Sequence, residues 1–283
     1  MDKITGGLLA EFSKEFEIEA LSEDKRFEQF AAYLTVRRHY SDSAFSPSDL
    51  VMGSGGDTGI DAIAVIINNN LITDLDAIDE LVEINGYLDV TFVFIQAERS
   101  ASFSTAKIGQ FGFGVRDLLG DRKLARSEDI KAVTEIVERI FALSSRFKGK
   151  NPACFLYYVT TGKGQDQNDI RVRRDTEWAE MEATGLFREV QFFLVGADQL
   201  QSLYNQTKNS VQREFQFSNR IVVPDIAGVK EAYLGYMTAT EILKLVRDDR
   251  NSIMKSLFYD NVRDWEGYNA INHENQTNAL QRQ

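Results

Sequence analysis

Two short apolar runs decide the fold: IDAIAVII at residues 60–67 and DVTFVFIQ at residues 89–96. Both are rich in β-branched or aromatic residues, and the first lies between a glycine-rich turn and the triplet NNN at residues 68–70. These features predict two strands. The second run is apolar at nearly every position before Gln96, which is typical of a central strand covered on both faces.

Outward from these runs, helical and strand patterns alternate along the chain. The expected elements are one or two helices ending near residues 41–43, two helices within residues 103–147, strands at residues 155–160 and 189–195, and helices at residues 169–184 and 198–205. This order predicts an α/β domain with a mixed sheet flanked by helices over residues 1–206. A helical period at residues 239–257 predicts a mostly helical C-terminal extension over residues 207–283.

Composition excludes several classes of protein. The 283 residues carry 32 Lys and Arg against 43 Asp and Glu, a formal net charge of −11. This charge argues against a protein that coats nucleic acid constitutively and without sequence preference. The single cysteine, Cys154, allows no intrachain disulfide and favours a reducing, cytoplasmic setting. No run approaches the roughly 18 apolar residues of a membrane span. With one thiol and two histidines, any metal site is expected to use carboxylates.

Charge is segregated along the chain. Residues 71–90 hold six acidic residues and no base, whereas the stretch from Arg99 to Arg126 is basic and contains only two Asp residues. We expect this basic stretch to follow a nucleic-acid backbone, because Lys and Arg neutralise phosphates. The residues predicted to do so are Arg99, Arg116, Arg122, Lys123 and Arg126.

Polar side chains interrupt the two apolar runs near one end of each. Asp61 opens the first run, and Gln96 and Glu98 close the second. Gln96 and Glu98 are two residues apart and therefore face the same side of a strand, where they can meet Asp61 if the strands are neighbours. Oxygen ligands suit Mg²⁺, Mn²⁺ or Ca²⁺, so a cation site is one interpretation. The alternative is that Asp61 caps the turn and Glu98 marks the exit of the strand into solvent.

These residues also carry a resemblance to a known family. Asp61, followed by the block FIQAE at residues 94–98, resembles the D…QxK form of PD-(D/E)XK nucleases, as in Mrr-like restriction endonucleases. More closely, the chain resembles the N-terminal part of the abortive-infection phage-resistance (AIPR) family. The blocks that carry this resemblance are GGDTGID at residues 55–61, FIQA at 94–97, Phe103 with residues 108–111, and LFYDNVRD at 257–264.

The resemblance implies a restriction-endonuclease-like core and a set of roles. Asp61 would be the principal metal ligand, Gln96 would occupy the second acidic position, and Glu28 would match an added helix carboxylate, although Glu28 also fits a solvated helix face. Glu98 stands where the pattern places lysine. Glu98 could bind a cation or act as a general base, or Lys107, nine residues further on, could reach back to supply the positive charge. Otherwise the site is inactive.

The sequence and the resemblance together predict a cytoplasmic endodeoxyribonuclease that depends on Mg²⁺ or Mn²⁺ and serves phage defence by abortive infection. The catalytic set would be Asp61, Gln96, Glu98 and Lys107, and the metal ligands Asp61, Glu98, Gln96 and Glu28. A homodimer would supply the two sites that double-strand cutting needs. Two alternatives remain open: a catalytically inactive module that binds nucleic acid or a protein partner, and a toxin that cleaves RNA rather than DNA.

Overall fold

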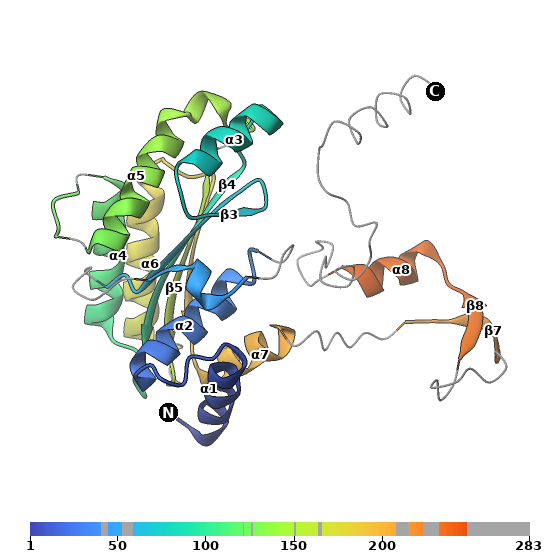
Figure 1. Cartoon of the computed structure of the whole chain (residues 1–283). Helices are drawn as coiled ribbons and strands as arrows, with labels where there is room; N and C mark the ends of the chain where they lie inside the picture. Colours follow the sequence, from blue (N-terminus) through green and yellow to red (C-terminus); the bar gives the residue numbers. More distant parts are fainter. Residues whose placement is uncertain are drawn as a thin grey trace. The chain divides into compact units, whose positions relative to one another are not determined.

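The computed structural model describes residues 1–40, 45–52, 59–120, 122–125, 127–149, 151–163, 166–207, 215–222 and 232–247. These residues fall into two compact units, one formed by Met1–Thr207 and the other lying within Lys208–Trp265 (Figure 1). The part of the chain that the structure describes contains no helix long and apolar enough to cross a membrane.

A mixed sheet forms the centre of the first unit (Figure 1). Its described strands are β1 Val51–Met52, β2 Ala62–Ile67, β3 Asn70–Ile72, β4 Val90–Glu98, β5 Ala153–Thr160 and β6 Glu189–Val195. They follow the order β1-β2-β4-β5-β6, with β3 paired to β2. Strand β2 is antiparallel to β1, β3 and β4, whereas β4, β5 and β6 run parallel. The predicted α/β class with a mixed sheet is therefore confirmed.

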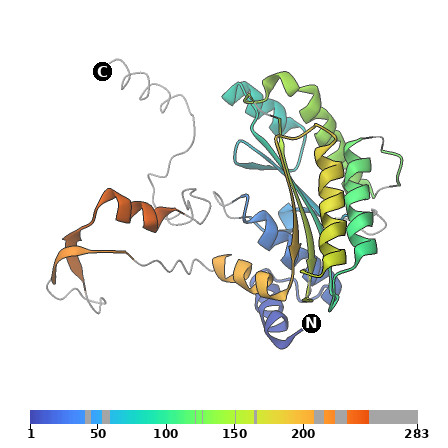
Figure 2. The same cartoon turned by 180° about the vertical axis from the view of Figure 1, so that it is seen from behind.

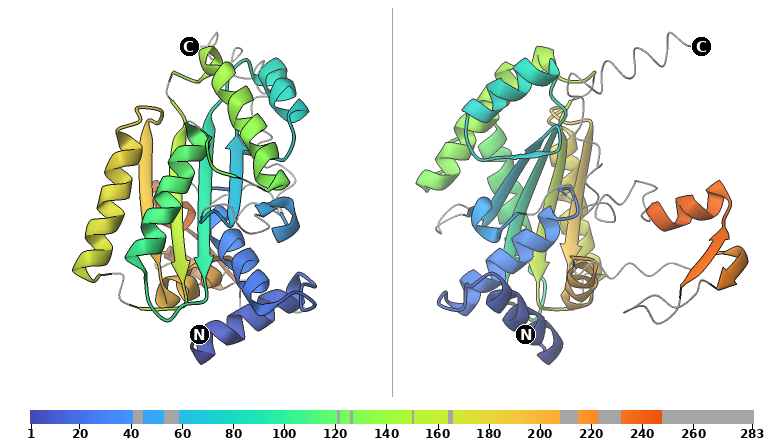
Figure 3. Two further views of the ribbon diagram at one scale, coloured as in Figure 1. Left: turned by 90° about the vertical axis from the view of Figure 1, so that its left-hand side faces the viewer. Right: turned by 45° about the vertical axis from the view of Figure 1, so that its right-hand side comes forward.

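Helices cover both faces of this sheet (Figures 2 and 3). The helices are α1 Lys3–Glu15, α2 Glu23–Val36, α3 Asp76–Asn85, α4 Thr105–Leu119, α5 Glu128–Ala142, α6 Asn168–Glu182 and α7 Ala197–Thr207, with 3₁₀ turns at Pro47–Asp49 and Ser144–Arg146. Alternate residues of β4 point to opposite faces. Phe92 and Phe94 pack with the α3–α6 side, whereas Val93 and Ile95 pack with α1, α2 and α7.

Local signals explain where several helices begin. The hydroxyls of Ser22, Ser104 and Ser127 accept hydrogen bonds from the backbone of the first turns of α2, α4 and α5, which satisfies N–H groups that have no intrahelical partner. Helix α3 is not among the elements that the sequence analysis predicts, because the six acidic residues of 71–90 mask its apolar positions. Ile78 of α3 is nonetheless buried in the core on the α4–α6 side.

The described residues of the second unit contain a strand pair that the sequence does not predict, beside the helix that it does predict. Strands β7 Ser218–Val222 and β8 Tyr233–Tyr236 form an antiparallel pair, followed by helix α8 Ala239–Val246. Helix α8 ends at Val246 because Arg247 adopts an extended backbone. Residues 248–257, which were expected to continue this helix, lie outside the described residues.

Candidate functional site

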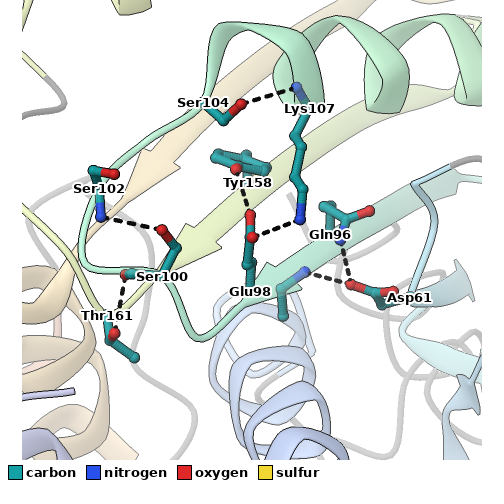
Figure 4. A network of polar contacts seen from close by, with 10 residues as sticks. Asp61, Gln96, Glu98, Ser100, Ser102, Ser104, Lys107, Tyr158 and Thr161 are labelled. Carbon is teal, nitrogen blue, oxygen red and sulfur yellow. Dashed lines mark hydrogen bonds and ion pairs between the residues drawn. The ribbon is translucent and has the colours of Figure 1, made fainter.

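The register of β2 and β4 places Asp61 beside Gln96 (Figure 4). Ala62 pairs with Ile95, and the backbone N–H of Asp61 donates to the carbonyl of Ile95 at 2.9 Å. The Oδ2 atom of Asp61 accepts two hydrogen bonds of 2.7 Å, one from Gln96 Nε2 and one from the backbone N–H of Ala97. The structure therefore joins two of the three polar residues that the sequence analysis selected, across neighbouring strands.

The Asp61 carboxyl is withdrawn from solvent, and burial raises its pKa from the ordinary value of 3.8 to about 7. The hydrogen bond from Ala97 opposes this rise in the pKa. The charge of Glu28 adds to the rise, while the ammonium groups of Lys25 and Lys107 lower the pKa. Near neutral pH, the Asp61 carboxyl of the folded protein is therefore partly protonated, and a nearby positive charge would favour its ionised form.

Gln96 contributes a second feature to this site. Its Nε2 atom is bonded to Asp61, but its Oε1 atom is buried and has no hydrogen-bond partner in the described structure. A buried acceptor without a donor costs about 1–3 kcal/mol. Gly59, with φ +77°, approaches the same atom, because a Cβ at position 59 would lie 3.1 Å from Gln96 Oε1 and 3.2 Å from the backbone of Phe111.

Glu98 lies two residues further along β4 on the same face and is held at both oxygens (Figure 4). Lys107 Nζ lies 2.5 Å from Glu98 Oε1, and the hydroxyl of Tyr158 donates to Glu98 Oε2 at 3.0 Å. Lys107 lies in the first turn of α4, where its backbone N–H donates to the Ser104 hydroxyl. Lys107 therefore does reach back to the strand end. Tyr158 was missed from sequence because it lies in a strand that is otherwise apolar.

Helix α2 brings further charges to the same end of the sheet. Glu28 is only 15 % exposed and pairs with Lys25 at 2.6 Å. Arg99, directly after β4, pairs with Glu23 at 2.8 Å and with Asp24 at 2.6 Å, which fastens the end of β4 to the beginning of α2. The structure thus places Glu28 near enough to raise the pKa of Asp61. It does not show Glu28 in direct contact with the Asp61–Gln96 pair.

The predicted nucleic-acid contacts are engaged with carboxylates or fall outside the described residues. Arg116 pairs with the buried Glu177 at 2.5 Å, and Arg122 pairs with Glu138. Arg126 lies outside the described residues. The backbone N–H of Lys123 donates to the Asp117 side chain at 2.9 Å. Arg99, Arg116 and Arg122 are therefore paired cations, and the expected contact with a nucleic-acid backbone stays a prediction.

The donor chemistry of Asp61 and Gln96 fits a hard divalent cation. A carboxylate and an amide oxygen are ligands that Mg²⁺ and Mn²⁺ accept, and a cation would supply the partner that Gln96 Oε1 lacks. No group of three or more His, Cys, Asp or Glu residues with metal-binding geometry occurs among the described residues. Asp61 and Gln96 would therefore hold such an ion together with water or substrate oxygens.

Comparisons of this chain with models of protein families, with curated proteins and with solved structures found no match.

Proposed function

We propose that the first unit is a nuclease that hydrolyses phosphodiester bonds, with DNA as the substrate and Mg²⁺ or Mn²⁺ as the cofactor. One observation carries this proposal. The half-buried carboxyl of Asp61, with its pKa raised to about 7, is bonded to the Gln96 amide nitrogen at the end of the sheet where β2 begins and β4 ends, and the oxygen of the same Gln96 amide has no partner among the described residues. Perturbed carboxyls beside convergent polar groups are typical of catalytic sites.

Each residue would have a distinct task. Asp61 and the Gln96 oxygen would hold the cation, which when bound lowers the pKa of water and neutralises phosphate charge. The Lys107 ammonium, fixed 2.5 Å from Glu98, would stabilise negative charge that develops on the phosphate oxygens. The covered face of the sheet beneath these groups would limit access of bulk water, which strengthens electrostatic interactions.

The test is cleavage by the purified full chain. Plasmid DNA and labelled DNA and RNA oligonucleotides are incubated with the protein in Mg²⁺, in Mn²⁺ or in a chelator. We expect cleavage of DNA that requires the cation and disappears in Asp61→Asn. Asp175→Asn is the matched control, since Asp175 is an exposed α6 residue paired with its neighbour Arg174. Cleavage that survives in Asp61→Asn, or that persists in chelator, contradicts the proposal.

A second candidate function is a nuclease-like module that binds nucleic acid or a protein without cutting. The observation in its favour is Glu98, whose two oxygens are already engaged with Lys107 and Tyr158. This candidate predicts binding of DNA without cleavage in any divalent metal. Cleavage of RNA but not DNA would instead favour a toxin. Phage defence is supported by the sequence resemblance alone, and plaque counts with wild type and Asp61→Ala would test it.

A further inference from the structure

Glu98 and Asp61 have partners of different chemical kinds. Asp61 is bonded to a side-chain amide and a backbone N–H, whereas Glu98 lies between an ammonium and a phenol. Lys107 Nζ occupies one oxygen of Glu98, and the Tyr158 hydroxyl occupies the other. Cation binding by Glu98 would compete with the ion pair to Lys107 and with the hydrogen bond from Tyr158.

The surroundings of Lys107 explain why this ammonium needs a carboxylate. Lys107 lies in the first turn of α4, with Ser104 at the N-cap. A cation at a helix N-terminus is disfavoured by the helix dipole. The Lys107 side chain is also 48 % exposed, so solvent competes for it. The ion pair with Glu98 counters both effects and keeps the ammonium on the face of the sheet that carries Asp61.

Tyr158 fixes the carboxylate in turn. Strand β5 is parallel to β4 and pairs Tyr158 with Gln96, so the Tyr158 side chain lies on the same face as Gln96 and Glu98. Tyr158 is fully buried, and its ring packs against Phe103 with the ring centroids 5.9 Å apart. A rigid phenol therefore restrains Glu98 Oε2, and Glu98 Oε1 remains directed at Lys107. Figure 4 shows this chain of contacts.

We propose that Glu98 and Tyr158 are positioning residues, which hold the Lys107 ammonium beside the Asp61–Gln96 pair, and that Glu98 is not a metal ligand. This inference rests on the proposed function, because the task of Lys107 is to meet the phosphate of a nucleic acid. It differs from the sequence-based interpretation of Glu98 as a ligand or a general base. It also adds Tyr158, which the sequence analysis did not select.

The first test measures cation binding without any substrate. Calorimetric titration of Mn²⁺ into the full chain is compared for wild type, Asp61→Asn and Glu98→Gln. We expect Asp61→Asn to weaken binding at least tenfold and Glu98→Gln to change it by less than about threefold, since a group that is not a ligand acts only through its charge. Glu128→Gln is the matched control, because Glu128 is an exposed residue paired with Lys131. Loss of binding in Glu98→Gln equal to that in Asp61→Asn overturns the inference.

The second test is a double-mutant cycle on kcat, measured with saturating substrate and Mg²⁺. We expect Lys107→Ala to reduce kcat about a hundredfold and Glu98→Gln about tenfold. In the Lys107→Ala background, Glu98→Gln should change kcat by less than about twofold, because a residue that acts through Lys107 has nothing left to position. Tyr158→Phe should reduce kcat by a smaller factor than Glu98→Gln, and this loss should also disappear in the Lys107→Ala background. The control is Tyr87→Phe, because the Tyr87 hydroxyl is exposed and accepts a hydrogen bond from Lys148.

The outcomes separate this inference from the proposed function. If the fold-losses of kcat multiply in the double mutant, so that the activation free energies add, Glu98 acts independently of Lys107, and the inference is overturned while the nuclease stands. A wild type that binds Mn²⁺ but cleaves neither DNA nor RNA overturns the proposed function, and the calorimetric comparison then decides whether Glu98 is a ligand. A wild type that binds no cation overturns both.

Discussion

Replacing Asp61 by Asn should stabilise the metal-free protein at pH 8 and should have little effect near pH 4. Burial raises the pKa of Asp61 from 3.8 to about 7 in the folded state. At a pH between 3.8 and about 7, Asp61 is protonated in the folded protein and ionised in the unfolded chain. The free energy of unfolding therefore falls as the pH rises through this window. The difference between a pKa of 3.8 and a pKa of about 7 corresponds to a loss of about 4 kcal/mol in the free energy of unfolding once the pH exceeds 7.

The assay is urea unfolding in chelator at pH 5, 6, 7 and 8, with the wild type, Asp61→Asn and the control Asp175→Asn compared at each pH. Asparagine removes the charge but keeps an oxygen that can accept the hydrogen bond from Ala97. The stability difference between Asp61→Asn and wild type should grow with pH and level off above pH 7. Saturating Mg²⁺ should reduce it, because a cation that binds the native carboxylate stabilises the wild type. A difference that is the same at every pH refutes the argument.

Three further perturbations test the packing and charge of the first unit. Gly112→Ala should lower the free energy of unfolding by about 1–3 kcal/mol, because a Cβ at position 112 would overlap the buried Glu177 side chain. Gly7→Ala makes the same chemical change at a site with open space and is the control. Equal effects of the two substitutions in thermal unfolding would exclude the overlap. Glu177→Ala should cost about 3–5 kcal/mol in urea unfolding, since it removes the buried partner of two arginines, and a loss below 1 kcal/mol would contradict this. Replacing Arg122 and Lys123 together by Ala should reduce the salt dependence of log affinity for duplex DNA by up to about 1.8, and an unchanged slope would show that neither residue contacts phosphate.

The strands of the site could be predicted because their signal is local. The runs that form β2 and β4 are continuous, apolar and rich in β-branched or aromatic residues, so few other structures would bury them. Strands β1 and β3 have only two and three residues, too few for a period to be recognised. Helix α3 has a helical spacing of apolar residues around Ile78, but its acidic residues make the segment look like an exposed charged stretch.

The site itself could be predicted only in part. Asp61 and Gln96 stand out because each is polar in an apolar strand, and antiparallel pairing then joins them. The partners of the basic stretch are far away in sequence: Arg99 pairs with Asp24, and Arg116 pairs with Glu177. A local count of charge cannot reveal such pairs. Nor can it reveal that a tyrosine hydroxyl in an apolar strand supports a carboxylate on the next strand.

The parallel pairing of β4 with β5 has a consequence for folding during synthesis. Asp61 and Gln96 are separated by 35 residues, whereas Tyr158 follows Glu98 by 60 residues. Antiparallel β2 and β4 can therefore pair on a nascent chain before β5 has left the ribosome, while the contact of longer range forms later. Until β5 docks, the apolar strand β4 presents an unpaired edge, which is prone to aggregation. In the nascent chain, the pair that would hold the cation precedes the tyrosine that restrains Glu98.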